Sequence, residues 1–478
     1  MAPSGHERHF GLWMRSVLYG LTLSLAVCAN NHTIAPALAE DGPWRLSEAI
    51  GLPDWLSLGG THRTRFETLD GQFRAGRNGG DQVLVLRTTL LGEFHLERLR
   101  LGAEFMDSRA ELADAGTPLN TGFVDVAELL QAYALYTADD WIESGSTTEI
   151  KGGRITMDVG SRRLVARNRF RNTINAFTGI DVTWTGADGR QARALLTLPI
   201  DRRPKSFAEL IDNKQEFDTE TADVVFWGAY FGMPALPWGG KGEVYVLGLH
   251  ESDSADRPTR NRRLYTPGVR VYRPPNKSAF DYEIESVFQF GTSRTSTAAT
   301  DTTDLNHFAH FQHVELGYSF AAPWSPRLVG QFDYASGDAE PTDDDNGRFD
   351  TLFGVRRFDF GPLGIYGPFA RANIITPGIR LQMKPHPRVT GFVAHRAFWL
   401  AEKQDAWTTA GVRDAAGATD GFIGQQIEAR VRWNILPGEV QLEAGAAHLF
   451  EGDFISDAPN ANGQGDATYA YLQLALTF

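Results

Sequence analysis

The sequence is poor in cysteine, in lysine and in long apolar stretches. Its 478 residues include one cysteine, Cys28, which excludes a disulfide framework and a cysteine-based metal cluster. After about residue 40 there is no run of about 18 apolar residues, which excludes a polytopic helical membrane protein. Of the 46 basic residues only 7 are lysine and 39 are arginine. The net charge of -13 argues against general binding of nucleic acid, so no nucleic-acid partner is expected.

The first 39 residues have the features of a secretory signal peptide. A weakly basic start is followed by an apolar run over residues 17–29, and Ala37-Leu38-Ala39 supplies the small-x-small pattern at which such peptides are cut. We therefore expect residues 1–39 to be a signal peptide and residues 40–478 to form the mature domain. The alternatives are an uncleaved anchor and a lipoprotein attached through Cys28.

The rest of the chain alternates between apolar and polar residues with a period of two. From Phe280 to Phe290 the even positions are mostly aromatic or aliphatic, and the odd positions are mostly acidic or amide. Residues 423–433 and 440–450 repeat the pattern. Successive side chains of a strand point to opposite faces, so each segment predicts a strand with one apolar and one polar face.

About 18 such segments occur, separated by alternately short and long connections. They begin near residues 55, 83, 98, 126, 147, 177, 190, 222, 242, 262, 279, 307, 326, 371, 388, 422, 439 and 468. Segments of about ten residues with this pattern are typical of a transmembrane β-barrel. Tryptophans near segment ends suit an interfacial girdle, namely Trp55, Trp141, Trp184, Trp238, Trp324, Trp399 and Trp407. We predict an all-β fold, a transmembrane antiparallel barrel of about 18 strands, with 16 as the alternative count.

The alternative architecture is a soluble β-propeller, β-helix or sandwich. Its core would then contain many arginine, glutamate and glutamine side chains, which is costly, whereas a barrel keeps that face in a wet lumen. The last segment ends on Phe478 behind alternating leucines, and this resembles the C-terminal sorting signal of bacterial outer-membrane proteins. We therefore expect the outer membrane of a Gram-negative bacterium, insertion by the barrel-assembly machinery through Phe478, and contact with lipid and lipopolysaccharide.

The polar face of the predicted strands is rich in arginine. Arginine is always charged and binds carboxylates through two nitrogens, and rings of it in a channel select anions. The alternative is that lumen arginines pair with lumen aspartates and glutamates and stiffen the barrel. The candidates for an anion path are Arg63, Arg65, Arg87, Arg154, Arg162, Arg163, Arg167, Arg169, Arg380 and Arg430.

Four blocks resemble the alginate exporter family of outer-membrane barrels. They are Gly152–Gly179, with its GSRRL and RFRNT sequences, Ser336–Gly361, His395–Trp407 and Ala446–Ile455. The resemblance implies an 18-stranded barrel with an arginine-lined constriction, which passes a polyuronate to the outside while long loops and turns gate the path. Within these blocks it adds Arg356 and Arg357 to the candidates and supports Arg154, Arg162, Arg163, Arg167 and Arg169.

Three functions remain open at this point. The first is an outer-membrane channel for an anionic polysaccharide such as alginate, with periplasmic export partners. The second is an import porin for small anionic solutes such as sugar acids or aromatic acids. The third is a structural or adhesive barrel with a closed lumen.

We expect no enzyme, since neither a Gly-x-Ser-x-Gly elbow nor a phosphate-binding glycine loop occurs. No cofactor is expected either. Asp343, Asp345 and Gly347 faintly resemble a calcium loop, and a loosely bound ion there is the alternative. On a strand the spacing of His307, His310 and His313 places His310 on the opposite face, which argues against a three-histidine metal site.

Overall fold

The computed structural model describes residues 42–114, 116–237, 239–254, 257–463 and 465–478. The signal peptide predicted for residues 1–39 lies outside them. Contacts divide the chain into residues 1–44 and residues 45–478, and all strands belong to the second unit. The described helices are α2 (Leu46–Ala49), α3 (Phe207–Ile211), α4 (Arg357–Phe360) and α5 (Asp453–Asp457). None of these described helices is long and apolar enough to cross a membrane.

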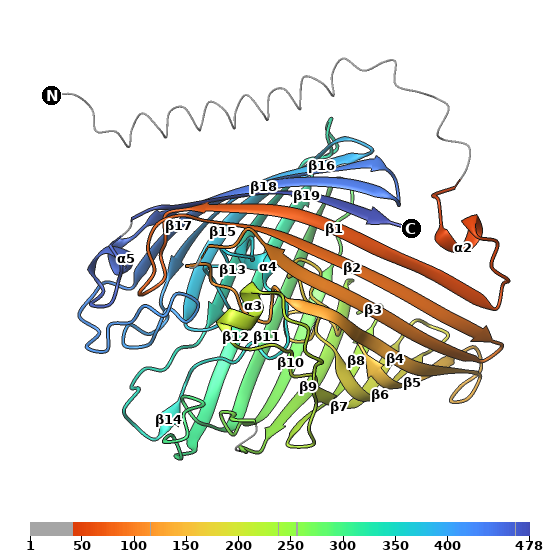
Figure 1. Cartoon of the computed structure of the whole chain (residues 1–478), viewed down its shortest axis with the longest axis horizontal. Coiled ribbons are helices and arrows are strands. Elements are labelled where there is room, and N and C mark those ends of the chain that lie inside the picture. Colours follow the sequence, from red (N-terminus) through yellow and green to blue (C-terminus); the bar gives the residue numbers. More distant parts are fainter. Residues whose placement is uncertain (1–41, 115, 238, 255–256, 464) are drawn as a thin grey trace. The chain divides into compact units, whose positions relative to one another are not determined.

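The strands of the second unit form one closed antiparallel sheet (Figure 1). Each long strand pairs with the next, and β1 pairs with β19, which closes the barrel with 18 long strands among the described residues and confirms the predicted fold. The short β14 pairs in parallel with β12. The strands are β1 (Leu56–Asp70), β2 (Asp81–Leu96), β3 (Leu99–Glu111), β4 (Asp125–Asp139), β5 (Thr147–Ile155), β6 (Phe177–Thr185), β7 (Gln191–Pro199), β8 (Val224–Met233), β9 (Lys241–Glu251), β10 (Arg263–Arg273), β11 (Ala279–Ser293), β12 (Leu305–Ser319), β13 (Arg327–Ala335), β14 (Asp345–Asn346), β15 (Ile374–His386), β16 (Val389–Trp399), β17 (Phe422–Leu436), β18 (Val440–Glu451) and β19 (Ala467–Thr477).

Short and long connections alternate around the barrel. Short turns such as residues 97–98 and 437–439 share one end with the start of β1 and the end of β19, and we call this the turn end. Long connections such as residues 200–223 and 336–373 share the other end, which we call the loop end. This is the arrangement of outer-membrane barrels, with short turns in the periplasm and longer loops outside.

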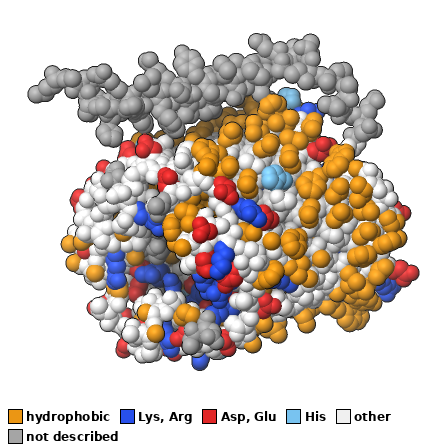
Figure 2. Space-filling model, viewed as in Figure 1, with side chains coloured by type: hydrophobic (Ala, Val, Ile, Leu, Met, Phe, Trp, Pro, Cys, Tyr) orange, Lys and Arg blue, Asp and Glu red, His pale blue; other side chains and the backbone are white. Residues whose placement is uncertain are grey.

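The two faces of the sheet differ as the alternation predicts. On β11, Phe280, Ile284 and Phe288 are exposed on the outside, whereas Asp281 and Glu285 are buried against the lumen. Hydrophobic side chains cover the broad outer surface of the strands (Figure 2). An apolar exterior over a polar interior suits a barrel surrounded by lipid.

The predicted tryptophan girdle is borne out only in part. Trp55, Trp141 and Trp324 are exposed near strand ends. The prediction is wrong for Trp407, which is 3% exposed and packs on Phe73. Trp238 lies outside the described residues.

Two long connections fold into the lumen instead of leaving it free. The first inward segment, residues 156–176, joins β5 to β6, and the second, residues 336–373, joins β13 to β15. They pair with each other, because the amide of Phe353 donates to the carbonyl of Leu164 at 2.9 Å and that of Val355 donates to Arg162 at 3.0 Å. The second segment is also tied to the wall, since the amide of Ile365 donates to the Glu67 carboxylate at 3.0 Å.

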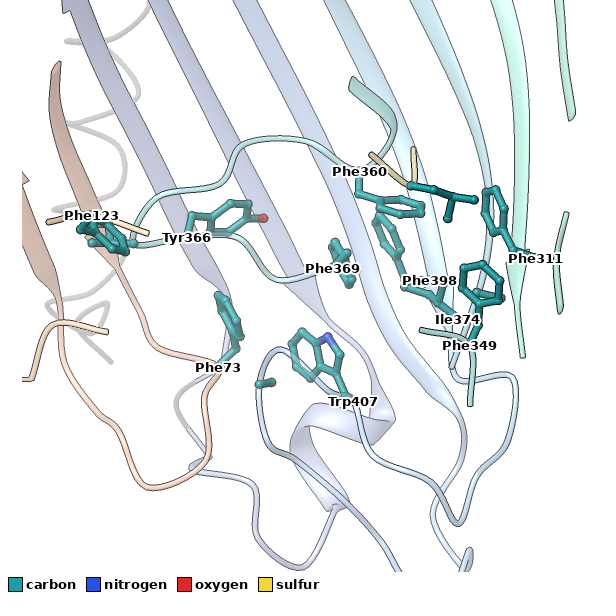
Figure 3. Packing of buried hydrophobic residues seen from close by; sticks show 14 of the residues in the cluster. Phe73, Phe123, Phe311, Phe349, Phe360, Tyr366, Phe369, Ile374, Phe398 and Trp407 are labelled. Carbon is teal, nitrogen blue, oxygen red and sulfur yellow. The ribbon is translucent and has the colours of Figure 1, made fainter. Parts of the chain in front are cut away.

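Aromatic side chains pack the second inward segment against the loop end (Figure 3). The rings of Phe369 and Phe398 stack with centroids 3.4 Å apart, and Trp407 stacks between Phe369 and Phe73. Burial of each large apolar side chain is worth about 2 kcal/mol. The cluster therefore fixes this segment inside the barrel.

A substitution at Gly354 tests the pairing of the two inward segments. A Cβ atom at this position would lie 1.7 Å from the carbonyl oxygen of Arg163. Because backbone cannot yield as a flexible side chain does, we expect Gly354→Ala to destabilise the folded barrel by about 1–3 kcal/mol. The measurement is the temperature at which the folded band is lost on a heat-modifiability gel. Gly152→Ala is the matched control, since a Cβ there meets nothing within 4 Å; equal midpoints for the two variants would contradict the pairing.

Candidate functional site

A cavity of about 400 Å³ opens between the turn end of the barrel and the two inward segments, and we call it the turn-side chamber. Strands β1, β2 and β17 to β19 supply its wall, because their polar parity faces the lumen. Two carboxylates, Asp158 and Glu443, line it. Seven arginines line it as well: Arg63, Arg87, Arg162, Arg169, Arg357, Arg430 and Arg432.

Two of these arginines bind neutral oxygens rather than carboxylates. Arg63 donates from Nη1 to the carbonyl of Arg169 and from Nη2 to Oδ1 of Asn172, both at 2.8 Å. Arg87 donates to the carbonyl of Arg171 at 3.0 Å. These bonds hold the first inward segment to β1 and β2, but they leave both positive charges uncompensated.

The guanidinium groups of two further arginines of the chamber, Arg162 and Arg430, have no hydrogen bond or ion pair to any described residue. The Arg162 guanidinium lies 5.5 Å from the ring centroid of Phe358, and that of Arg430 lies 4.8 Å from the centroid of Phe392. A ring face attracts a cation but does not neutralise it. Both groups are therefore available to a passing anion.

The other three arginines of the chamber are paired with carboxylates. Arg357 lies 2.6 Å from Glu428, and Arg432 lies 2.5 Å from Glu443. Arg169 is 3.2 Å from Asp158 through a side chain that is 67% exposed. These pairs lower the excess positive charge without removing it.

A second cavity, of about 300 Å³, lies on the loop side of the first inward segment, and we call it the loop-side chamber. Arg65, Arg171, Arg202 and Arg356 line it, and no aspartate or glutamate is among its described lining residues. Four asparagines also line it: Asn120, Asn168, Asn172 and Asn175. Figure 2 shows Lys and Arg side chains gathered in the hollow at the loop end.

The arginines of the loop-side chamber differ in what they bind. Arg65 is neutralised by Glu67 at 2.7 Å. Arg171 and Arg202 both donate to Oδ1 of Asn175, which is neutral. Arg356 has no side-chain partner among the described residues; burial and then Arg371 lower its pKa to about 10, so it remains charged at neutral pH.

Four arginines from the sequence-based set line neither chamber. Arg163, buried, contacts Glu283, Glu285 and Asp359 and lies 2.9 Å from Nε2 of His313. It thereby joins the first inward segment to the second and to β11 and β12. Two others are also paired with carboxylates, Arg154 with Glu128 at 2.9 Å and Arg167 with Glu104 at 2.5 Å. Arg380 instead donates to the neutral carbonyl of Phe358 at 2.7 Å.

Three chamber arginines were absent from the sequence-based set. Arg171 lies in the block that suggested its neighbours, and Arg432 shares the polar parity of Arg430, so both had a signal in the sequence. Arg202 lies in the long connection between β7 and β8, where no periodicity singles it out.

The three histidines of β12, His307, His310 and His313, lie as the alternation of side chains along a strand predicts. His307 and His313 are buried on the lumen side of β12, whereas His310 stacks on Tyr334 with centroids 5.0 Å apart. These three described side chains do not converge on one point. That the protein needs no cofactor stays a prediction, with a loosely bound divalent ion at Asp343 and Asp345 as its alternative.

A cluster of three carboxylates near the loop end makes the stability of the folded barrel depend on pH. Oxygens of Asp125, Glu128 and Asp218 lie within 4.8 Å of one another. Burial and then Glu128 raise the pKa of Asp218, a loop residue, to about 7. From about pH 4 to 7 the folded chain therefore holds a proton that the unfolded chain releases, so stability falls as the pH rises through this range.

We expect the urea midpoint of unfolding to be higher at pH 5 than at pH 8. Asp218→Asn should flatten this difference, because an amide cannot ionise. Asp420→Asn, at a side chain that is 57% exposed, is the control and should leave the difference unchanged. The same change in midpoint from pH 5 to pH 8 in the wild type and in Asp218→Asn would contradict the assignment.

Comparisons with known proteins agree with this architecture. The family model described as alginate export matches residues 54–467. None of the curated proteins matches the chain.

Solved outer-membrane barrels share the fold at low sequence identity. The Pseudomonas aeruginosa protein OccK8 (OprE) is 12% identical with a TM-score of 0.55, covering 88% of this chain and 98% of that one. A BenF-like porin from Pseudomonas fluorescens Pf-5 is 11% identical with a TM-score of 0.54, covering 88% and 99%. Pseudomonas aeruginosa OpdK, solved with vanillate, is 10% identical with a TM-score of 0.53, covering 88% and 99%.

The family and the fold are those of outer-membrane transport channels and not of enzymes. The matched region spans nearly the whole barrel, from the residue before Trp55 to the first residue of β19. The chain belongs to the alginate export family.

Proposed function

We propose that the protein passes an anionic polysaccharide of the polyuronate class, such as alginate, along the arginines of its two chambers. The observation that supports this best is the charge of the turn-side chamber, where seven arginines face two carboxylates. Arg162 and Arg430 lie there without any carboxylate partner among the described residues. The family membership supports the same class of solute.

A polyuronate presents one carboxylate per sugar to such a lumen. Guanidinium groups replace part of the water lost by each carboxylate, which lowers the barrier to entry. A unit charge about 4 Å away is worth about 1 kcal/mol in water, so each contact is weak enough to release the chain again. Asp158 and Glu443 limit the net attraction, because a trap for anions would not conduct.

Passage of a polymer requires the inward segments to move. Asn168 lines both chambers, so the first inward segment forms the wall between them. We infer that residues 156–176 swing aside when a polymer passes, while the barrel wall remains in place. The ion pairs of Arg163 and Arg167 hold this segment in the arrangement described here.

The second candidate is an import porin for small anionic solutes. Its support is the size of the chambers, since cavities of about 300 and 400 Å³ match the lower range of small-molecule sites, about 300–1,000 Å³. Sugar acids and aromatic acids are small enough to enter cavities of this size. The two candidates differ in the length of the solute and agree on its charge.

Current block in a planar bilayer tests the proposal. The refolded protein is exposed to oligomannuronates, to neutral oligosaccharides of equal length, and to glucuronate and benzoate. Block by the oligouronates at lower concentrations than by the small acids is expected. Block by the small acids alone would favour the import porin, and equal block by the neutral oligosaccharides would overturn the role of charge.

A further inference from the structure

The loop-side chamber holds hydrogen-bond donors that the protein itself does not use. Arg356 has no side-chain partner among the described residues, although it is enclosed by the second inward segment. Asn168 is 6% exposed; its Oδ1 accepts the amide of Arg171 at 3.3 Å, and its Nδ2 has no partner among the described residues. Both groups border the cavity, so a ligand that accepts hydrogen bonds from both would be stabilised here.

The charge of this chamber differs from that of the turn-side chamber. No described lining residue is acidic, and Arg171 and Arg202 are held by the neutral Asn175. The turn-side chamber has two carboxylates that compete with an incoming anion. An anion should therefore reside longer in the loop-side chamber than in the turn-side chamber.

The polar lining also fits hydroxyl groups. The four asparagines of its lining, Asn168 among them, reach this cavity together with residues of the second inward segment. A carboxylate accepts from a guanidinium through both oxygens, and sugar hydroxyls both donate and accept. A volume of about 300 Å³ limits the occupant to a small molecule or to one unit of a polymer.

We propose that the loop-side chamber is a saturable site for one sugar-acid unit, with the carboxylate on Arg356 and Arg171 and a hydroxyl on Asn168. This assignment rests on the proposed function and names the unit that the channel recognises. The turn-side chamber is then a path that anions cross without saturating it. Selectivity for charge and affinity for the sugar acid thus reside in different arginines.

The test measures block of single-channel current by glucuronate in the wild type, in Arg356→Gln and in Arg162→Gln. Arg356→Gln should raise the half-blocking concentration of glucuronate at least tenfold and leave the reversal potential nearly unchanged. Arg162→Gln, in the turn-side chamber, should shift the reversal potential and change the half-blocking concentration less than twofold. Unchanged block in Arg356→Gln overturns the assignment, whereas a wild type that is not anion-selective overturns the proposed function instead.

A second variant and two further probes keep the assignment falsifiable if Arg356→Gln fails to fold. Asn168 has a φ of 55°, which aspartate also tolerates, so Asn168→Asp keeps the backbone and places a carboxylate in the chamber. This variant should lose glucuronate block. Glucose should not block, and inorganic phosphate should block at least tenfold more weakly than glucuronate. Equal block by phosphate would show a general anion site and overturn the sugar-acid assignment.

Discussion

Reversing the charge of Arg162 and Arg430 together, in Arg162→Glu/Arg430→Glu, is expected to abolish anion selectivity and favour cations. Both guanidinium groups face the turn-side chamber without a carboxylate partner among the described residues, so no internal pair has to be broken. A unit charge at about 4 Å is worth about 1 kcal/mol in water, and reversing it replaces that attraction by an equal repulsion, a change of about 2 kcal/mol for each residue. We expect the anion-to-cation permeability ratio to fall at least tenfold, as measured by reversal potential at low salt, where screening is weak.

The matched control for this variant is Arg190→Glu. Arg190 lies on the short turn between β6 and β7 beside Asp188 and Glu143, with a side chain that is 43% exposed. It carries the same charge and lies in neither chamber. A shift of similar size in both variants would show that overall charge, and not the chamber, sets the selectivity.

Removal of the Arg163 side chain is expected to release the first inward segment from its place in the lumen. In Arg163→Ala the buried carboxylates of Glu285 and Asp359 lose a cation that lies 2.8 and 3.0 Å away. Loss of one partner of a buried pair costs about 3–5 kcal/mol. Because these contacts join the first inward segment to the second and to β11, we expect the segment to be released while the barrel stays closed, and the single-channel conductance to rise severalfold.

Arg327→Ala separates this effect from the loss of any lumen ion pair. Arg327 contacts Asp281 and Glu315, which belong to β11 and β12, and it contacts neither inward segment. This variant should lose stability without a comparable gain in conductance. If Arg163→Ala folds and its conductance equals that of the wild type, the inward segment is not what restricts the lumen.

The barrel wall could be predicted closely because its signals are local. The segments expected near residues 147, 177, 279 and 422 begin at those residues, and all 18 expected starts lie within three residues of an observed strand start. Alternation of side chains and turn-rich connections are both visible within about ten residues. The placement of Arg63, Arg65 and Arg87 on the lumen face follows from the same parity.

The contents of the lumen could not be predicted because their contacts are long-range. Whether an arginine is free or paired depends on partners far away in the chain, as for Arg163 with Asp359 or Arg154 with Asp218. Trp407 carries the same local signal as an interfacial tryptophan, yet its loop folds inward onto Phe73. The sequence-based alternative of paired lumen arginines thus holds for Arg65, Arg154, Arg163, Arg167, Arg169 and Arg357. Arg162, Arg356 and Arg430 have no carboxylate partner among the described residues.

The reversal potential of the refolded wild-type protein across a potassium chloride gradient tests the central claim most directly. The proposed anion path predicts a potential of the sign that chloride permeation gives, and a size that decreases as salt screens the chamber arginines. A potential of the opposite sign, showing that potassium permeates better than chloride, would contradict the assignment of the arginine-lined chambers as the path of the solute.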